Sequence, residues 1–532
     1  MTAPQNLTGD QFEQAPVPRA ESSNKLKVGA IGLFGVLFMA VANAAPITAM
    51  TGNVPIAVGY GNGIGAPAGY LVATIVLTLF TVGFVAMARY ITTAGAFYGF
   101  ISQGLGQIWG MAAGGLAAMA YIVFEGSLIG IFSYFGTTVL NDWFGWNVSW
   151  LIIALIGIAA IAVFGYYDIN IAAAVLGFFL ICEVLLLGAI SIGILFQGGG
   201  PDGMMTEAVN PLNAFKDLPA GGGLPDGASF GLEGVGPGLA AIGLFFAFWS
   251  WVGFETTAVY GEESRNPKRI VPLATLIAVV GLGLFYTFVS WMVLAGNGAE
   301  QAQSLSAAGD LNLFIGQAKD VLGNWSTYVY QFLIVMGSFA CALAFHNAAS
   351  RYLYAIGREI PATAKTLGAT HGVHHSPHIA SAVQSVITLV LTLGFFFFTN
   401  NGNNALQGAY FYQYGLLAIL GTFAILLVQT ICSVAVIWYF HVKKAQPSNF
   451  FVTGLIPLLG ALGMAYVCYL LITNLTFAGG AASGSPFFKA IPYIVVATFA
   501  LGLAAALYLR SSKPEVYQAI GRTVLEEAHT RD

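Results

Sequence analysis

Three acidic residues, Glu125, Glu183 and Glu255, lie well inside hydrophobic stretches that are long enough to cross a bilayer. No lysine or arginine shares those stretches. A bare charge at membrane depth costs roughly 2.5–3.5 kcal/mol on insertion scales, so such acids are expected to face a cavity, a partner or a bound cation. Because they lack fixed basic partners, they favour a cationic ligand, whether a proton, sodium or an amine.

Each of these acids also has a purely structural interpretation. Glu255 is suited to cap a half-helix, since an acid near a helix N-terminus is favourable, although its context favours gating. Glu183 is interpreted either as a coupling or cation-binding residue or as a protonated packing residue. For Glu125, function and structural hydrogen bonding stay equally open. His346 is a fourth candidate, because imidazole ordinarily titrates in the physiological range; we interpret it as a packing residue, with a proton relay as the alternative.

The elements that must position these residues are membrane helices. The 532-residue chain is 57% hydrophobic and only 8% charged, against about 25% charged in soluble domains. Repeated long apolar stretches therefore predict an all-α polytopic membrane protein. Twelve transmembrane helices are predicted, at residues 28–58, 65–88, 106–138, 148–165, 169–196, 237–261, 270–295, 326–351, 378–398, 406–440, 450–474 and 489–510.

The basic residues predict the orientation of these helices. If both termini are cytoplasmic, sixteen of the nineteen Lys and Arg residues lie on or near the cytoplasmic side. Only Lys216, Lys319 and Lys489 fall outside, as the positive-inside rule requires. We therefore predict a multi-pass protein of the plasma membrane, with cytoplasmic tails at residues 1–27 and 511–532.

The first and sixth predicted helices are both interrupted. Pro46 and Pro55 fall inside the first, where proline removes a backbone donor and clashes with the preceding turn. In the sixth, Gly253 follows a crowded aromatic run. Matched breaks at corresponding places in two five-helix halves favour a substrate site near the bilayer midplane, with ordinary kinks as the alternative. The predicted substrate-binding residues are Ala45, Pro46, Ile47, Thr48, Phe248, Trp249, Ser250, Trp251, Val252 and Gly253.

Residues 248–255 and the following run Asn266-Pro267-Lys268-Arg269-Ile270-Val271-Pro272 closely resemble the sixth span of amino acid–polyamine–organocation (APC) superfamily permeases. Residues 94–98 resemble the re-entrant loop after span two of that superfamily, and residues 345–358 the end of span eight. The chain is most similar to bacterial basic amino acid and polyamine antiporters. The resemblance implies a 5+5 inverted-repeat core over residues 28–440, with broken helices 1 and 6, and two peripheral transmembrane helices in 441–510.

The resemblance also implies roles for individual residues. Trp249 matches an aromatic residue that closes over the substrate, residues 250–253 match an unwound segment whose carbonyls bind the substrate amine, and Glu255 matches an acid linked to gating and pH response. The chain departs from the family at residues 45–49, which lack a Gly-Ser-Gly-like turn that holds an α-carboxylate, so a decarboxylated amine becomes a candidate substrate. In span five, Glu183 stands where some proton-coupled members carry a lysine.

We therefore predict a secondary active transporter of amino acids or related amines. It is expected to work by alternating access, as a proton-coupled symporter or an exchanger. Glu255, Glu183, Glu125 and His346 are the coupling or gating candidates. A sodium-coupled amino acid symporter is the alternative, and a membrane-embedded sensor or enzyme is the interpretation from another class, without a catalytic motif to support it.

The predicted partners are a small-molecule substrate, a proton or sodium, and membrane lipid, with a homo-oligomer left open. No nucleic acid, cofactor or metal is expected. The loop histidines are interpreted as solvated rather than metal-binding, since they lack cysteine or carboxylate partners at ligand spacing; they are His371, His374, His375 and His378.

Overall fold

The structure is a computed structural model that describes residues 26–521 except 28, 168, 217–239, 309–310, 400–407, 474–481 and 483. Regular structure in this part of the chain is helical. The described residues also form two isolated β-bridges, between Ile31 and Ser264 and between Gly200 and Gly203. The all-α prediction is therefore confirmed for the described residues.

Ten helices in the described part of the chain are long and apolar enough to cross a membrane. Such helices satisfy their own backbone groups, as a bilayer requires, and the chain is accordingly an integral membrane protein. These ten are Leu33–Gly61, Gly63–Ala88, Gln107–Phe144, Leu176–Gln197, Pro267–Asn297, Trp325–Glu359, His378–Thr399, Gly408–Val442, Phe451–Thr473 and Pro486–Ser512. The predicted spans at 148–165 and 237–261 correspond to shorter helices, Trp150–Tyr166 and Ala240–Trp249.

The α-helices are α1 (Leu33–Ala44), α2 (Pro46–Ile56), α3 (Ala66–Ala88), α4 (Phe97–Leu105), α5 (Gln107–Phe144), α6 (Trp150–Tyr166), α7 (Ile169–Gln197), α8 (Ala240–Trp249), α9 (Pro267–Asn297), α10 (Ala299–Ala308), α11 (Asn312–Leu322), α12 (Trp325–Glu359), α13 (His378–Thr399), α15 (Leu417–Ile437), α16 (Ile456–Thr473), α18 (Pro486–Ser512) and α19 (Pro514–Ala519). Short π-helical turns adjoin several of them, at Ala57–Gly61, Gly408–Leu416, Trp438–Val442 and Phe451–Leu455.

Local sequence explains where several helices begin and end. α9 and α18 begin with Pro267 and Pro486, at the helical position where a missing backbone N–H costs nothing. The Ser485 hydroxyl caps α18 by accepting a hydrogen bond from the Phe488 N–H at 3.1 Å. The C-terminus of the long helix α5 is capped by Gly145, whose φ of 70° lies in the left-handed region.

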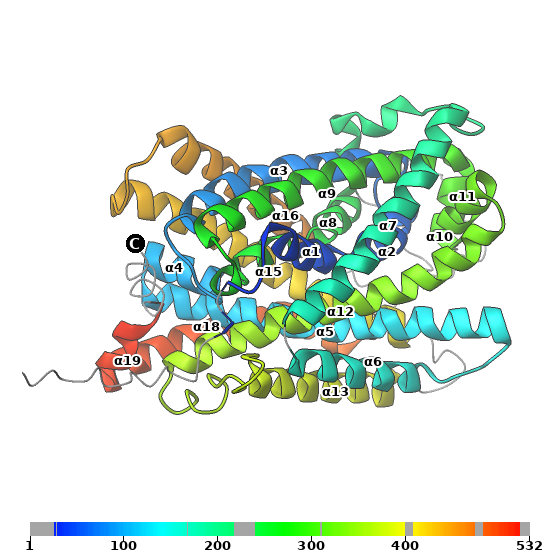
Figure 1. Ribbon diagram of the computed structural model, residues 1–532. Helices are drawn as coiled ribbons and strands as arrows, with labels where there is room; N and C mark the ends of the chain where they lie inside the picture. Colours follow the sequence, from blue (N-terminus) through cyan, green and yellow to red (C-terminus); the bar gives the residue numbers. More distant parts are fainter. Residues whose placement is uncertain are drawn as a thin grey trace, which may run out of the picture.

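Two layers of helices enclose the broken segments (Figure 1). α5 and α12 run alongside one another, and α6 and α13 lie side by side beneath them in the view. α3 and α9 pack together on the other side of the bundle. Because α1, α2 and α8 lie between these layers, the interruptions in them are held in the interior of the protein.

The end of the described chain returns to the bundle. The Gly521 N–H donates a hydrogen bond to the Glu359 carboxylate at 3.1 Å, at the end of α12. Gln103 Nε2 donates to the Gly521 carbonyl at 2.8 Å. Gly521, which follows the short helix α19 (Pro514–Ala519) in the predicted C-terminal tail, therefore contacts α4 and α12.

Candidate functional site

The first broken segment lies between α1 and α2. Ala45 has φ 41° and ψ 77°, a left-handed conformation that is uncommon for a residue with a Cβ. Side chains from other helices bind the carbonyls that the break frees. The Tyr286 hydroxyl donates to the Ala44 carbonyl at 2.9 Å, and Cys341 Sγ donates to the Asn43 carbonyl at 3.1 Å. The prediction that the first span is interrupted is confirmed at this position.

A carboxylate from another helix contacts the new N-terminus of α2. Glu183 Oε2 on α7 accepts a hydrogen bond from the Ile47 N–H at 3.2 Å, and its side chain is only 2% exposed. Free amides at a helix N-terminus favour anions. Glu183 therefore places the protein's own carboxylate where a bound anion would meet α2.

The second broken segment follows α8. That helix ends at Trp249, and a 3₁₀ turn, Phe254–Ala258, resumes after Gly253. Gly253 has φ 110°, a conformation that favours glycine. Glu255 reaches back so that its Oε2 accepts from the Gly253 N–H at 3.1 Å, while its Oε1 accepts from the Tyr121 hydroxyl at 2.8 Å. The carboxylate thus caps this turn and joins it to α5.

A small cavity lies between the two broken segments. Its volume is about 30 Å³, which is room for about one water molecule. A larger ligand therefore requires the walls to move apart. The lining residues are Asn43, Ala44, Ala45, Thr48, Ala49, Asn53, Phe124, Ser127, Leu128, Trp249, Ser250, Val252, Cys341, Phe345 and Tyr414.

Five of the ten predicted substrate-binding residues line this cavity, and the other five do not. Those that line it are Ala45, Thr48, Trp249, Ser250 and Val252. Those buried in the surrounding packing are Pro46, Ile47, Phe248, Trp251 and Gly253. Trp251, for example, donates from Nε1 to the Val279 carbonyl at 3.3 Å and packs edge-on against Tyr286. Its contacts are those of a packing residue.

Two residues that line the cavity each carry a buried oxygen with no hydrogen-bond partner among the described residues. These oxygens are Asn43 Oδ1 and Thr48 Oγ1. By contrast, Ser250 Oγ accepts a hydrogen bond from Asn53 Nδ2 at 2.9 Å. Buried polar atoms are costly when unpaired, and the lining residues include no charged side chain. The neutral residues that line the cavity thus include two with an oxygen that lacks a partner in the described part of the chain.

Trp249 lines the cavity, and its indole ring stacks on the ring of Tyr414. Its ring lies 5.2 Å from that of Tyr414, with an interplanar angle of 30°. The Tyr414 hydroxyl donates in turn to Asn53 Oδ1 at 3.3 Å. Asn43, Asn53 and Tyr414 line the cavity but were not predicted as site residues. The two asparagines carry a usable signal, since each is a polar residue inside the interrupted first span, whereas nothing in its local sequence distinguishes Tyr414.

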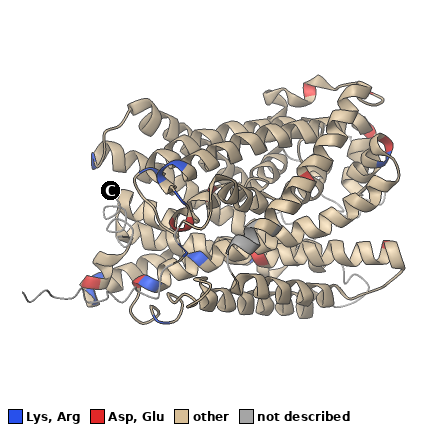
Figure 2. Ribbon diagram, viewed as in Figure 1, with Lys and Arg blue, Asp and Glu red and all other residues tan. Residues whose placement is uncertain are grey.

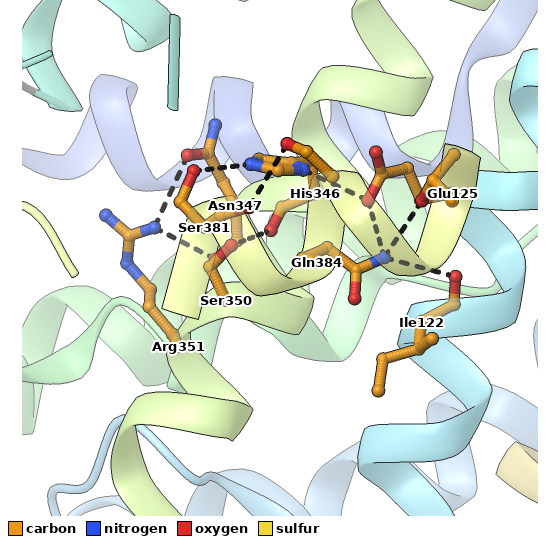
Figure 3. Close-up of polar contacts among 10 residues, drawn as sticks. Ile122, Glu125, His346, Asn347, Ser350, Arg351, Ser381 and Gln384 are labelled. Atoms are coloured by element: carbon orange, nitrogen blue, oxygen red, sulfur yellow. Dashed lines mark hydrogen bonds and ion pairs between the residues drawn. The ribbon is translucent and has the colours of Figure 1, made fainter. Parts of the chain in front are cut away.

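Glu125 and His346, which were predicted separately, form one buried pair (Figure 3). His346 Nδ1 lies 3.0 Å from Glu125 Oε2, and both side chains are 0% exposed. His346 Nε2 lies 2.7 Å from Ser381 Oγ. Gln384 Nε2 donates to Glu125 Oε2 at 2.6 Å. The structure thus joins two of the four coupling candidates through α5, α12 and α13, while the other two acids hold separate positions.

Two ion pairs that the sequence analysis missed join α12 to the segment after the second break. Arg351 binds Glu263 through two hydrogen bonds of 2.6 and 2.9 Å. Arg358 binds Glu262 at 2.8 Å. Next to them, the Ile31 N–H donates to the Glu263 carbonyl at 3.1 Å. These contacts fasten the chain before α1, the segment after the second break and the end of α12 to one another.

The loop histidines lie close together but form no metal site in the part of the chain that the structure describes. The rings of His371 and His374 stack with centroids 4.9 Å apart. Slight desolvation and the neighbouring imidazoles lower the pKa of His371 from its ordinary value. Within the described residues, no group of three or more His, Cys, Asp or Glu residues is arranged to hold a metal ion.

The fold and the site define an integral membrane protein with a small cavity between two broken helical segments, and comparison with known proteins identifies its family. The chain belongs to the amino acid permease family, which it matches over residues 31–499. The resemblance to APC permeases is therefore confirmed. Membership of this family indicates a transporter rather than an enzyme.

Individual relatives align over shorter regions. A cadaverine/lysine antiporter of Escherichia coli (strain K12) is 34% identical over 83 residues, which cover 16% of this chain and 18% of the antiporter. An uncharacterized transporter of Rhizobium meliloti (strain 1021) is 27% identical over 154 residues, which cover 28% of this chain and 31% of that protein. The aligned regions thus span less than a third of each relative.

Proposed function

We propose that the chain is a secondary active transporter of amino acids or related amines, with the substrate bound between the two broken segments. The observation that carries the proposal is the small cavity between them, lined by Asn43 and Thr48, each of which carries a buried oxygen without a partner among the described residues. Broken helices build the midplane sites of many transporters. Because the cavity holds about one water molecule, binding requires the walls to separate, as alternating access provides.

The proposed substrate class is a cationic amine, with diamines preferred over α-amino acids. Glu183 accepts from the Ile47 N–H, so the α2 terminus is already occupied by a carboxylate and disfavours a second one. Trp249 lines the cavity, and an ammonium group that met its indole face there would gain about 0.5–2 kcal/mol. The partial likeness to a cadaverine/lysine antiporter supports the same class.

The proposed topology has twelve membrane crossings. It adds α6 and the interrupted segment that begins with α8 to the ten long apolar helices, in a 5+5 inverted repeat with two peripheral helices. Figure 2 shows Lys and Arg gathered mainly at one end of the bundle, the end where the described chain finishes. The positive-inside rule then favours a cytoplasmic location for both termini, in the plasma membrane.

A transport assay on the purified full-length chain in liposomes tests this proposal. Liposomes loaded with unlabelled cadaverine should take up radiolabelled cadaverine, with competition from lysine and weaker competition from neutral amino acids. Replacing sodium with choline at fixed pH should leave the flux unchanged. Flux that vanishes in choline would show a sodium requirement and favour the sodium-coupled alternative, and competition by neutral amino acids alone would overturn the amine assignment. If neither cadaverine nor any amino acid is exchanged, the chain is not a transporter of this class.

Substituting Glu183 should shift the substrate preference. In Glu183→Ala, the Ile47 N–H is free to bind a substrate carboxylate, and a hydrogen bond to a charged group contributes about 1.5–3 kcal/mol. We expect the ratio of lysine to cadaverine affinity to rise by about tenfold or more, measured by competition against labelled cadaverine. Glu207→Ala, which removes an exposed acid, is the control. An unchanged ratio would show that Glu183 does not set the preference for amines.

A further inference from the structure

We propose that Glu125, His346 and Ser381 form the site that binds and releases one coupling proton, separate from the substrate cavity. The inference rests on the proposed transport function and names the group that responds to the proton. Its basis is the hydrogen-bonded series from Glu125 Oε2 to His346 Nδ1, and from His346 Nε2 to Ser381 Oγ, at 3.0 and 2.7 Å. All three side chains are at most 3% exposed.

The same atomic positions fit two protonation states. In one state, Glu125 is a carboxylate, His346 donates from Nδ1 to Glu125, and the Ser381 hydroxyl donates to Nε2. In the other, the imidazole carries a second proton on Nε2 and donates it to Ser381 Oγ, because a hydroxyl can donate or accept. Gln384 Nε2 donates to Glu125 Oε2 in both. Uptake of one proton thus changes the group from net charge −1 to 0 without breaking the heavy-atom geometry.

A net negative charge here has no permanent counter-ion among the described residues. From α13, the neutral Ser381 and Gln384 hydrogen-bond to the pair. From α6 it meets Gly165, where an added Cβ would lie 2.6 Å from His346 Nε2. A buried carboxylate without a cation is costly, so proton uptake by the imidazole relieves that cost.

Three other titratable groups on the helices around the pair have partners of their own. On α12, Arg351 binds Glu263. On α5, Tyr121 donates to Glu255. On α6, Tyr166 contacts His371 at 2.9 Å, in the loop that leads to α13. His378, at the start of α13, and Tyr352, which stacks on Tyr121, are further titratable groups on these helices. None is hydrogen-bonded to Glu125 or His346.

The pair is connected to the substrate cavity through its neighbours in sequence. Phe124 and Phe345, which directly precede Glu125 and His346, both line the cavity. Their rings contact one another, with centroids 5.1 Å apart. Consecutive helical residues point in different directions, so α5 and α12 present aromatic rings to the substrate and the titratable pair to another face. Any change in the separation of α5 and α12 on protonation therefore moves two walls of the cavity.

The test separates exchange from proton-driven accumulation in liposomes that contain the full chain. Exchange of labelled for unlabelled cadaverine at equal pH needs no net proton movement, whereas accumulation under an imposed pH gradient does. One pH unit can sustain at most about tenfold accumulation per coupled proton. For Glu125→Gln and, independently, His346→Asn, we expect exchange to persist and the accumulation ratio to fall to about one. The pH dependence of exchange should also flatten.

A matched control is available outside this group. His441 Nε2 lies 3.0 Å from Thr453 Oγ1, another imidazole–hydroxyl contact, and His441→Asn should leave accumulation at the wild-type level. Wild-type accumulation in both Glu125→Gln and His346→Asn would overturn the proposal, as would loss of accumulation in the His441 variant to the same degree. Absence of cadaverine, lysine and neutral amino acid exchange in the wild type would instead overturn the transport function itself.

Discussion

Replacing Glu263 with alanine should destabilise the protein by about 3–5 kcal/mol, because removal of one partner leaves a buried charge uncompensated. Arg351 and Glu263 are only 3% and 2% exposed. Two direct hydrogen bonds join them, and the guanidinium also donates from Nη1 to the Asn347 carbonyl at 2.9 Å. Without the carboxylate, the guanidinium would remain in an apolar interior. Thermal and denaturant unfolding of the detergent-solubilised protein measures the loss.

The neighbouring ion pair provides the comparison. Arg358 and Glu262 are 16% and 14% exposed, so we expect Glu262→Ala to be less destabilising than Glu263→Ala, because a more exposed pair is better solvated. The double variant Arg351→Met with Glu263→Leu should recover much of the stability lost in Glu263→Ala, since no charge is then buried alone. Equal losses in the two single alanine variants, or no recovery in the double variant, would contradict this account.

This contact also has a consequence for transport. The Glu263 backbone is bound to Ile31, just before α1, and its side chain is bound to α12. Opening the bundle at this end requires these contacts to separate. Loss of the ion pair should therefore favour conformations that are open at this end, in addition to lowering stability.

The helices and their interruptions were predictable from sequence because their causes are local. Apolar length predicts a membrane helix, and Pro46 and Gly253 each impose a backbone constraint within a few residues. The structure breaks the chain at Ala45, next to the first of these residues, and at Gly253 itself. The family resemblance rested on a similarly local run of residues.

The pairings of the acids were not predictable because they depend on helix packing. Glu125 and His346 are 221 residues apart in sequence, and Glu183 and Ile47 are 136 apart. A sequence read span by span treats each side chain alone, so Glu125 appeared as an acid without a partner and His346 as a packing residue. The two arginine–glutamate pairs were missed for the same reason. The functional roles of all four candidates stay predictions until transport is measured.

Substituting Gly253 with alanine should lower transport by at least about tenfold, an effect that needs only about 1.4 kcal/mol in the limiting barrier. Two features of the structure combine there. Gly253 has φ 110°, and a residue with a Cβ in such a sparsely populated region costs about 1–3 kcal/mol. An added Cβ would also lie 2.3 Å from Asn43 Cβ, so the two broken segments would be forced apart at the cavity wall.

The variant Gly106→Ala distinguishes backbone strain from the steric contact with Asn43. Gly106 also has a positive φ, 104°, but an added Cβ would meet nothing within 4 Å. We expect Gly106→Ala to lose some stability from backbone strain while retaining cadaverine exchange near the wild-type rate. Gly253→Ala should lose exchange even where the purified protein remains monodisperse, since the distortion acts on the contact between the two segments. If both variants lose exchange equally, backbone strain alone explains the effect, and the close approach of Gly253 to Asn43 does not control substrate binding.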